Sequence, residues 1–112
     1  MAARFAYRHP EQVAGLVLWA AYPAAGDDLS SRDLAVVSLY ATRDSIADAS
    51  QIEASRALLP DSTVWVAIEG GNHAQFGWYG EQSGDGEPAI SRPAQQEQIV
   101  AATVALLHSL QP

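Results

Sequence analysis

The sequence predicts a three-layer α/β fold built on a parallel β-sheet, and two observations support this fold class. Three short segments, 12–21, 34–41 and 62–68, are nearly continuous in apolar residues, as expected of parallel strands covered on both faces. Segments of helical character precede the first strand, separate the second from the third, and follow the third, which is the alternation typical of a parallel sheet. At 112 residues the chain is at most one domain, and a small one for this architecture.

The elements of the first half are delimited by breaker residues. Residues 1–9 have the composition of the end of a helix, which the pair His9-Pro10 stops. The strand at 12–21 follows directly. Residues 22–33, rich in Pro, Gly, Asp and Ser, then form a loop that leads to the strand at 34–41. This loop is too short to hold a helical lid over a site.

In the second half a capping-box pattern at Ser50 and Glu53 predicts a helix running to Leu59, before the strand at 62–68. A long glycine-rich connection, 70–93, leads to a final helix at 94–110, with Ser91-Arg92-Pro93 at its start. This helix is expected to present a wide apolar face. The face consists of Val100, Val104 and Leu107, flanked by Ile99, Thr103, Leu106 and Leu110.

Composition excludes several classes of function. The net charge of −7 argues against nucleic acid or an anionic membrane surface as a partner, and no apolar run approaches the length of a membrane span. The chain has no cysteine, and its histidines lack the spacing of metal ligands, so no metal or other cofactor is expected. The N-terminus does not have the pattern of a signal peptide. We therefore expect a soluble protein, with a cytoplasmic location favoured although the compartment stays open.

Two residues follow buried strands in a way that suggests catalysis. Asp44 comes just after the strand at 34–41, and His73 lies in a glycine-rich turn after the strand at 62–68. The carboxyl ends of parallel strands meet at one sheet edge, so we expect the two side chains to lie within about 4 Å of each other. The alternatives are that His73 is a turn histidine bonded to backbone, and that Asp44 only begins an Asx-type turn. Asp48 competes for the acidic role, but it stands at the mouth of a helix.

Four pieces of the sequence together resemble the C-terminal half of an α/β-hydrolase, of the compact kind grouped near dienelactone hydrolases and small esterases. The pieces are Arg4–Glu11, Val13–Leu18, Leu39–Asp44 and Gly70–Gly77, in the family's order and at plausible spacing. The resemblance implies serine-dependent hydrolysis of a small ester-like substrate. It places the triad's acid at Asp44 and its base at His73, with the Asp44 carboxylate accepting a hydrogen bond from Nδ1–H.

The same resemblance implies that the nucleophilic serine, in a G-x-S-x-G turn, and both oxyanion-hole donors belong to a preceding half of the domain. No serine of this sequence lies in such a motif, so residues 1–112 are expected to be a partial domain that is inactive alone. The alternative is a non-catalytic remnant or interaction module. In either case the apolar edge of the strand at 12–21 would lack its neighbour, and we expect self-association through it.

Four further residues have less specific interpretations. Trp78 and Tyr79 either line a substrate rim or pack locally, and the sequence does not decide between these. His9 and His108, at the ends of helices, are expected to be structural.

Overall fold

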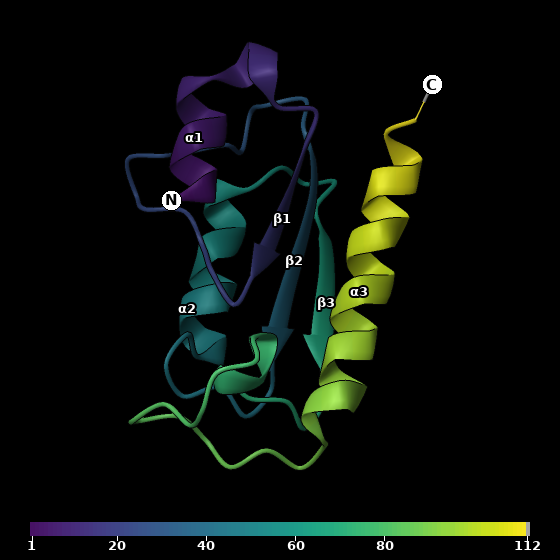
Figure 1. Cartoon of the computed structure of the whole chain (residues 1–112). Coiled ribbons are helices and arrows are strands. Elements are labelled where there is room, and N and C mark those ends of the chain that lie inside the picture. The colour runs from purple at the N-terminus through teal and green to yellow at the C-terminus, as the bar shows by residue number, and fades with distance from the viewer. Residues whose placement is uncertain (112) are drawn as a thin grey trace.

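The computed structural model describes residues 1–111, which form one three-stranded sheet with helices on both faces (Figure 1). The strands are β1 (Gly15–Trp19), β2 (Ala35–Ala41) and β3 (Val64–Ile68), all parallel and in the order β1-β2-β3. Ala41 pairs with Ile68, so the last residues of β2 and β3 lie side by side. The turns that follow these two strands therefore begin at the same edge of the sheet.

Helices α1 (Ala2–Arg8) and α2 (Ala49–Ala54) cover one face of the sheet, and α3 (Arg92–Ser109) covers the other (Figure 1). Single turns of 3-10 helix extend the elements at η1 (Pro10–Gln12) and η2 (Ser55–Leu58). The predicted three-layer α/β fold, with its parallel sheet and flanking helices, is thus confirmed.

Each face of the sheet has its own apolar core. The core under α3 consists of Ala20, Val37, Leu39, Ala41, Ala47, Ile68, Phe76, Ile99 and Leu106. The core under α1 consists of Ala3, Ala6, Leu16, Leu18, Leu29, Val36 and Leu59. β3, at the sheet edge, is less covered, and Val64 at its start is 55% exposed. In β1 and β2 the residues alternate between the two cores, so both faces are largely buried, which explains their nearly continuous apolar runs in the sequence. Trp19, at the end of β1, is an exception because it is 46% exposed and donates its indole N–H to Thr103 Oγ1 at 3.2 Å.

The predicted capping box at Ser50 and Glu53 is wrong. Asp48 is the N-cap of α2, its side chain accepts a hydrogen bond from the Gln51 amide, and the Gln51 side chain accepts one from the Asp48 amide. The Ser50 hydroxyl instead donates to Asp48 Oδ1 at 2.6 Å. The N-cap thus lies two residues earlier than predicted, and its side chain satisfies the free amide of Gln51, so α2 begins at Ala49. The helix then tightens into η2 rather than running to Leu59 as regular α-helix.

The apolar face predicted for the final helix is only half correct. Ile99 and Leu106 are buried against the sheet, whereas Val100, Val104 and Leu107 are 55%, 41% and 55% exposed. The buried stripe is therefore narrow and offset by about one residue from the predicted centre. The remaining differences are at the ends of elements. β1 and β3 are shorter than the apolar runs 12–21 and 62–68, and α3 spans Arg92–Ser109 rather than 94–110.

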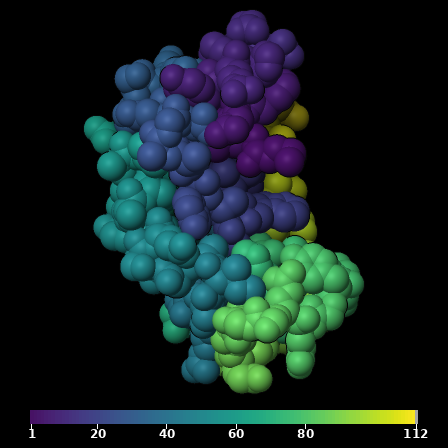
Figure 2. Space-filling view, turned by 90° about the vertical axis from the view of Figure 1, so that its left-hand side faces the viewer, coloured from purple at the N-terminus to yellow at the C-terminus, as the bar shows by residue number. Residues whose placement is uncertain are grey.

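The long connection after β3 lies at the end of the molecule where the strands finish. It contains the 3-10 turn η3 (Ala74–Phe76) and then runs without regular structure to Ser91, which caps α3 by accepting a hydrogen bond from the Ala94 amide. Figure 2, which faces the α1 and α2 layer, shows this segment forming the protruding end of the molecule. Among residues 1–111, no helix combines the length and apolarity that crossing a bilayer requires.

Candidate active site

Asp44 is fixed in the turn that follows β2. Its side chain is fully buried, and its Oδ1 accepts hydrogen bonds from the amides of Ile46 and Ala47, both at 2.8 Å. Asp44 therefore forms the local turn that was the alternative interpretation of this residue. That turn occupies only one carboxylate oxygen and holds the other, Oδ2, in a defined direction.

His73 lies opposite Asp44 in the turn that follows β3. Its Nδ1 is 2.8 Å from Asp44 Oδ2, and 22% of its side chain is exposed. The expected proximity of the two side chains is thus confirmed. Asp48 is occupied in capping its own helix, so it is not the partner of His73. Gly70 makes the turn possible, because its φ of +80° is in the left-handed region that residues with a side chain rarely adopt.

Three hydrogen bonds join the two turns to each other. The Thr42 hydroxyl accepts from the Gly70 amide at 2.8 Å, and the Thr42 amide donates to the Ile68 carbonyl at 3.1 Å. The Arg43 amide donates to the Gly71 carbonyl at 2.9 Å. Because these bonds continue the pairing of β2 with β3 past the end of the sheet, the backbones that carry Asp44 and His73 are held at a fixed separation.

A buried amide network holds the turn of His73 against α3. Gln95 is fully buried, and its Oε1 accepts hydrogen bonds from the Asn72 amide at 3.1 Å and from Gln75 Nε2 at 2.9 Å. Its Nε2 donates to the Asn72 carbonyl at 2.9 Å. A single side chain thus satisfies both backbone groups of the residue before His73. Because these backbone groups are buried, they would otherwise lack partners.

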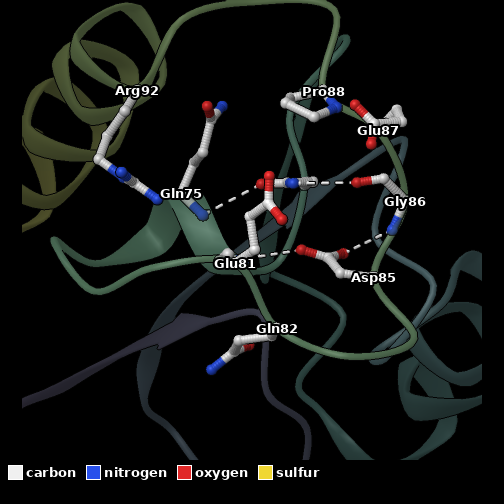
Figure 3. Close-up of a pocket in the computed structure, with 10 residues that line it drawn as sticks. Gln75, Glu81, Gln82, Asp85, Gly86, Glu87, Pro88 and Arg92 are labelled. Atoms are coloured by element: carbon white, nitrogen blue, oxygen red, sulfur yellow. Dashed lines mark hydrogen bonds between the residues drawn. The ribbon is translucent and has the colours of Figure 1, made fainter.

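Beside the histidine turn lies a polar pocket of about 270 Å³ (Figure 3). Gln75 and Arg92 lie on one side of it, and Asp85 and Gly86 lie on the other. The Asp85 carboxylate accepts from the backbone amides of the histidine turn, and the Gly86 carbonyl accepts from Asn72 Nδ2 at 3.0 Å. The long connection is therefore anchored to the site by specific hydrogen bonds.

The geometry defines what His73 can do chemically. A carboxylate that accepts at Nδ1 holds the proton of the neutral imidazole on that nitrogen, which leaves Nε2 free to accept a proton. Within residues 1–111, no side chain forms a hydrogen bond with Nε2, and in particular no serine hydroxyl does so. The same part of the chain contains no cluster of three histidine or acidic side chains arranged to hold a metal ion.

The loop aromatics that follow the site are exposed, Trp78 by 71% and Tyr79 by 50%. Arg92 holds both, because its guanidinium lies 5.7 Å from the Trp78 ring centre and donates to the Tyr79 carbonyl at 2.9 Å. The His9 ring packs on Phe5 with ring centres 4.5 Å apart, far from the site. His108 lies in the last turn of α3.

The residues that hold the Asp44–His73 pair in place are not among those that the sequence pattern singles out. For only one of them, Gln95, does the sequence contain a pattern from which its burial could have been predicted. Gln95 precedes Ile99 by four residues and Leu106 by eleven, so helical spacing alone places it on the buried stripe of α3. Thr42, Asn72 and Asp85 are ordinary loop residues in the sequence, and their roles depend on contacts between distant segments.

Comparison with known proteins supplies one match. A family model described as the alpha/beta hydrolase family matches residues 1–97. No curated protein and no solved structure matches significantly.

Proposed function

Because the chain belongs to the α/β-hydrolase family, we propose that Asp44 and His73 are the acid and base of a serine-dependent hydrolase site. The observation that carries this proposal is the 2.8 Å contact between His73 Nδ1 and Asp44 Oδ2 at the carboxyl ends of adjacent parallel strands. The proposed reaction is hydrolysis of an ester-like bond in a small molecule. The substrate class is that of dienelactone hydrolases and small esterases.

In this reaction a serine oxygen attacks the carbonyl carbon of the substrate while His73 Nε2 takes the hydroxyl proton. The imidazolium then gives that proton to the leaving alkoxide, and a water molecule repeats the sequence on the acyl-enzyme. Asp44 accepts a hydrogen bond from Nδ1–H throughout and stabilises the positive charge on the ring. Its burial strengthens this interaction, since water does not screen a carboxylate that is fully enclosed.

The proposal assigns the nucleophile and the oxyanion-hole donors to residues outside this sequence, because no serine among the 112 residues lies in G-x-S-x-G. The first arm of the test is therefore negative. The 112-residue chain should not be labelled by a fluorophosphonate probe, and its turnover of p-nitrophenyl acetate should equal that of a His73→Ala variant. Stoichiometric labelling of a serine, with turnover that depends on His73, would contradict this assignment.

The second arm uses the full product of the encoding reading frame. If that product contains a G-x-S-x-G turn before α1, it should be labelled, and His73→Ala should abolish turnover. Asp44→Asn should lower kcat by about 10⁴-fold, because the neutral amide no longer holds the reactive tautomer. The matched controls are His108→Ala and Asp48→Asn, which remove a histidine and an acid outside the site. Loss of activity in either control would show that general destabilisation, rather than catalysis, is being measured.

A second candidate function, association without catalysis, is favoured by the position of β1. The sheet order places β1 at an edge, so one side of this apolar strand has no neighbour among the described residues. We expect such an edge to pair with a second copy or another chain. Sedimentation velocity at micromolar concentration tests this, together with binding of the dye ANS. A monodisperse monomer with no ANS signal and cooperative unfolding would exclude it.

A further inference from the structure

The carboxylate of Asp85 spans two consecutive amides of the histidine turn. Its Oδ1 accepts a hydrogen bond from the His73 amide at 3.1 Å, and its Oδ2 accepts one from the Ala74 amide at 2.9 Å. These amides open η3, where a helical turn leaves its first N–H groups without internal partners. A carboxylate in this position forms charge-assisted bonds, which are stronger than bonds to a neutral acceptor. Asp85 thus restrains the backbone of His73 itself.

The residue after Asp85 touches the other half of the pair. A Cβ added to Gly86 would overlap the carbonyl oxygen of Arg43, so the backbone of Gly86 packs directly on the residue before Asp44. The Gly86 carbonyl also accepts from Asn72 Nδ2, and Asn72 directly precedes His73. Residues 85–86 are therefore in contact with both turns, although they are remote from both in the sequence.

From these contacts we propose that Asp85 is a positioning residue for His73. Its carboxylate bonds to backbone amides and forms no hydrogen bond with the imidazole. It fixes the His73 backbone relative to the Asp44 turn, so that Nδ1 stays within hydrogen-bonding distance of Asp44 Oδ2. The catalytic consequence rests on the proposed function, since misplacing a base by about 1 Å can cost about 10²-fold in rate. The positioning itself does not require that the site be active.

This role also accounts for an unusual feature of the sequence. A connection of this length without regular structure is uncommon in a compact domain unless it serves a function. Here the segment after η3 returns to place Asp85 and Gly86 across the pocket from Gln75 and Arg92 (Figure 3), where they contact both turns. Its return path is thus part of the support of the site.

The test is proton and nitrogen NMR of the 112-residue chain labelled with ¹⁵N-histidine. The wild type should show a downfield Nδ1–H signal from His73, because that proton lies in a short bond to a buried carboxylate. In Asp85→Ala we expect this signal to broaden or disappear. Asp85→Asn keeps one acceptor oxygen and should give an intermediate result. Glu87→Ala is the matched control, because it removes an acid that lines the same pocket and forms no hydrogen bond in the structure.

Hydrogen exchange separates positioning from general destabilisation. In Asp85→Ala the protection of the Ala74 amide should fall by about tenfold or more, as expected for loss of a bond to a charged acceptor. Protection of the Ile99 amide, in the buried part of α3, should stay unchanged. If Asp85→Ala does not fold, the same comparison is made with Asp85→Asn.

An Nδ1–H signal with wild-type shift and exchange rate in a folded Asp85 variant would overturn the proposal. Equal loss of protection at Ala74 and Ile99 would also overturn it, since Asp85 would then be only a stabilising residue. Neither readout depends on ester hydrolysis. Failure of the positioning role is therefore distinct from failure of the proposed function.

Discussion

Replacement of Gln95 by methionine should destabilise the protein far more than its conservative size suggests. Methionine has a similar length and fits the same path, but it can neither accept from the Asn72 amide nor donate to the Asn72 carbonyl. Gln75 Nε2 is not counted as a loss, because it keeps its bond to the Ile90 carbonyl at 3.1 Å. The perturbation therefore leaves two buried backbone groups of Asn72 without partners.

Each unsatisfied buried group costs about 1–3 kcal/mol, so the two together cost about 2–6 kcal/mol. Burial of the methionine side chain offsets about 2 kcal/mol of this cost, so from the middle of the range we expect a net loss of about 2 kcal/mol in the free energy of unfolding. Domains of this kind are stable by only about 5–15 kcal/mol. The thermal midpoint should accordingly fall by about 8 °C.

Urea unfolding followed by tryptophan fluorescence measures this difference. The matched control is Gln98→Met, which makes the same exchange at an exposed position of the same helix and should change stability by less than about 0.5 kcal/mol. If Gln95→Met is as stable as Gln98→Met, the reasoning is refuted. The buried amide network would then not hold the turn that carries His73.

Two other perturbations test the turns and the cap. Hydrogen bonds from the Ser50 hydroxyl and the helix amides hold the pKa of Asp48 below its ordinary value of 3.8. The ionised cap therefore stabilises the fold at pH values above 3.8. This contribution is lost as the pH falls through the lowered pKa of the folded state. Asp48→Ala should thus lower the unfolding midpoint at neutral pH, and the gap from wild type should close in acid; a gap that widens in acid would contradict the sign. Gly86→Ala should cost about 1–3 kcal/mol through its overlap with the Arg43 carbonyl, whereas Gly80→Ala, in open space, should cost little; equal thermal midpoints for the two variants would disprove close packing there.

The sheet and the Asp44–His73 contact could be predicted because both follow from short-range patterns. A continuous apolar run predicts a buried parallel strand, and the first polar residues after it must lie at the carboxyl edge of the sheet. Asp44 and His73 both follow such runs, so their meeting requires only that their strands be neighbours. No long-range information beyond that is needed.

The supports of the pair depend on contacts that no local pattern records. Asp85 reaches the His73 amide only because the long connection turns back, and nothing in a loop of Gly, Glu and Ser specifies that path. The error at α2 has a different cause. Ser50 and Glu53 fit the capping pattern, but Asp48 and Gln51 fit its geometry as well, and the aspartate forms both the cap and the bond to Ser50. Residue spacing alone therefore does not show which of two overlapping capping boxes begins the helix.

The pairing of Ala41 with Ile68 implies which parts of this chain can change length without affecting the site. Asp44 follows Ala41 by three residues and His73 follows Ile68 by five, so these two short intervals set the distance between carboxylate and imidazole. The stretch between Asp44 and β3 affects that distance only if it changes the register in which β2 pairs with β3. An insertion at the exposed turn around Asp61 should therefore be tolerated, whereas one extra residue between Ala41 and Asp44 should separate the pair. Related chains are expected to vary in length at the first place and to be constant at the second.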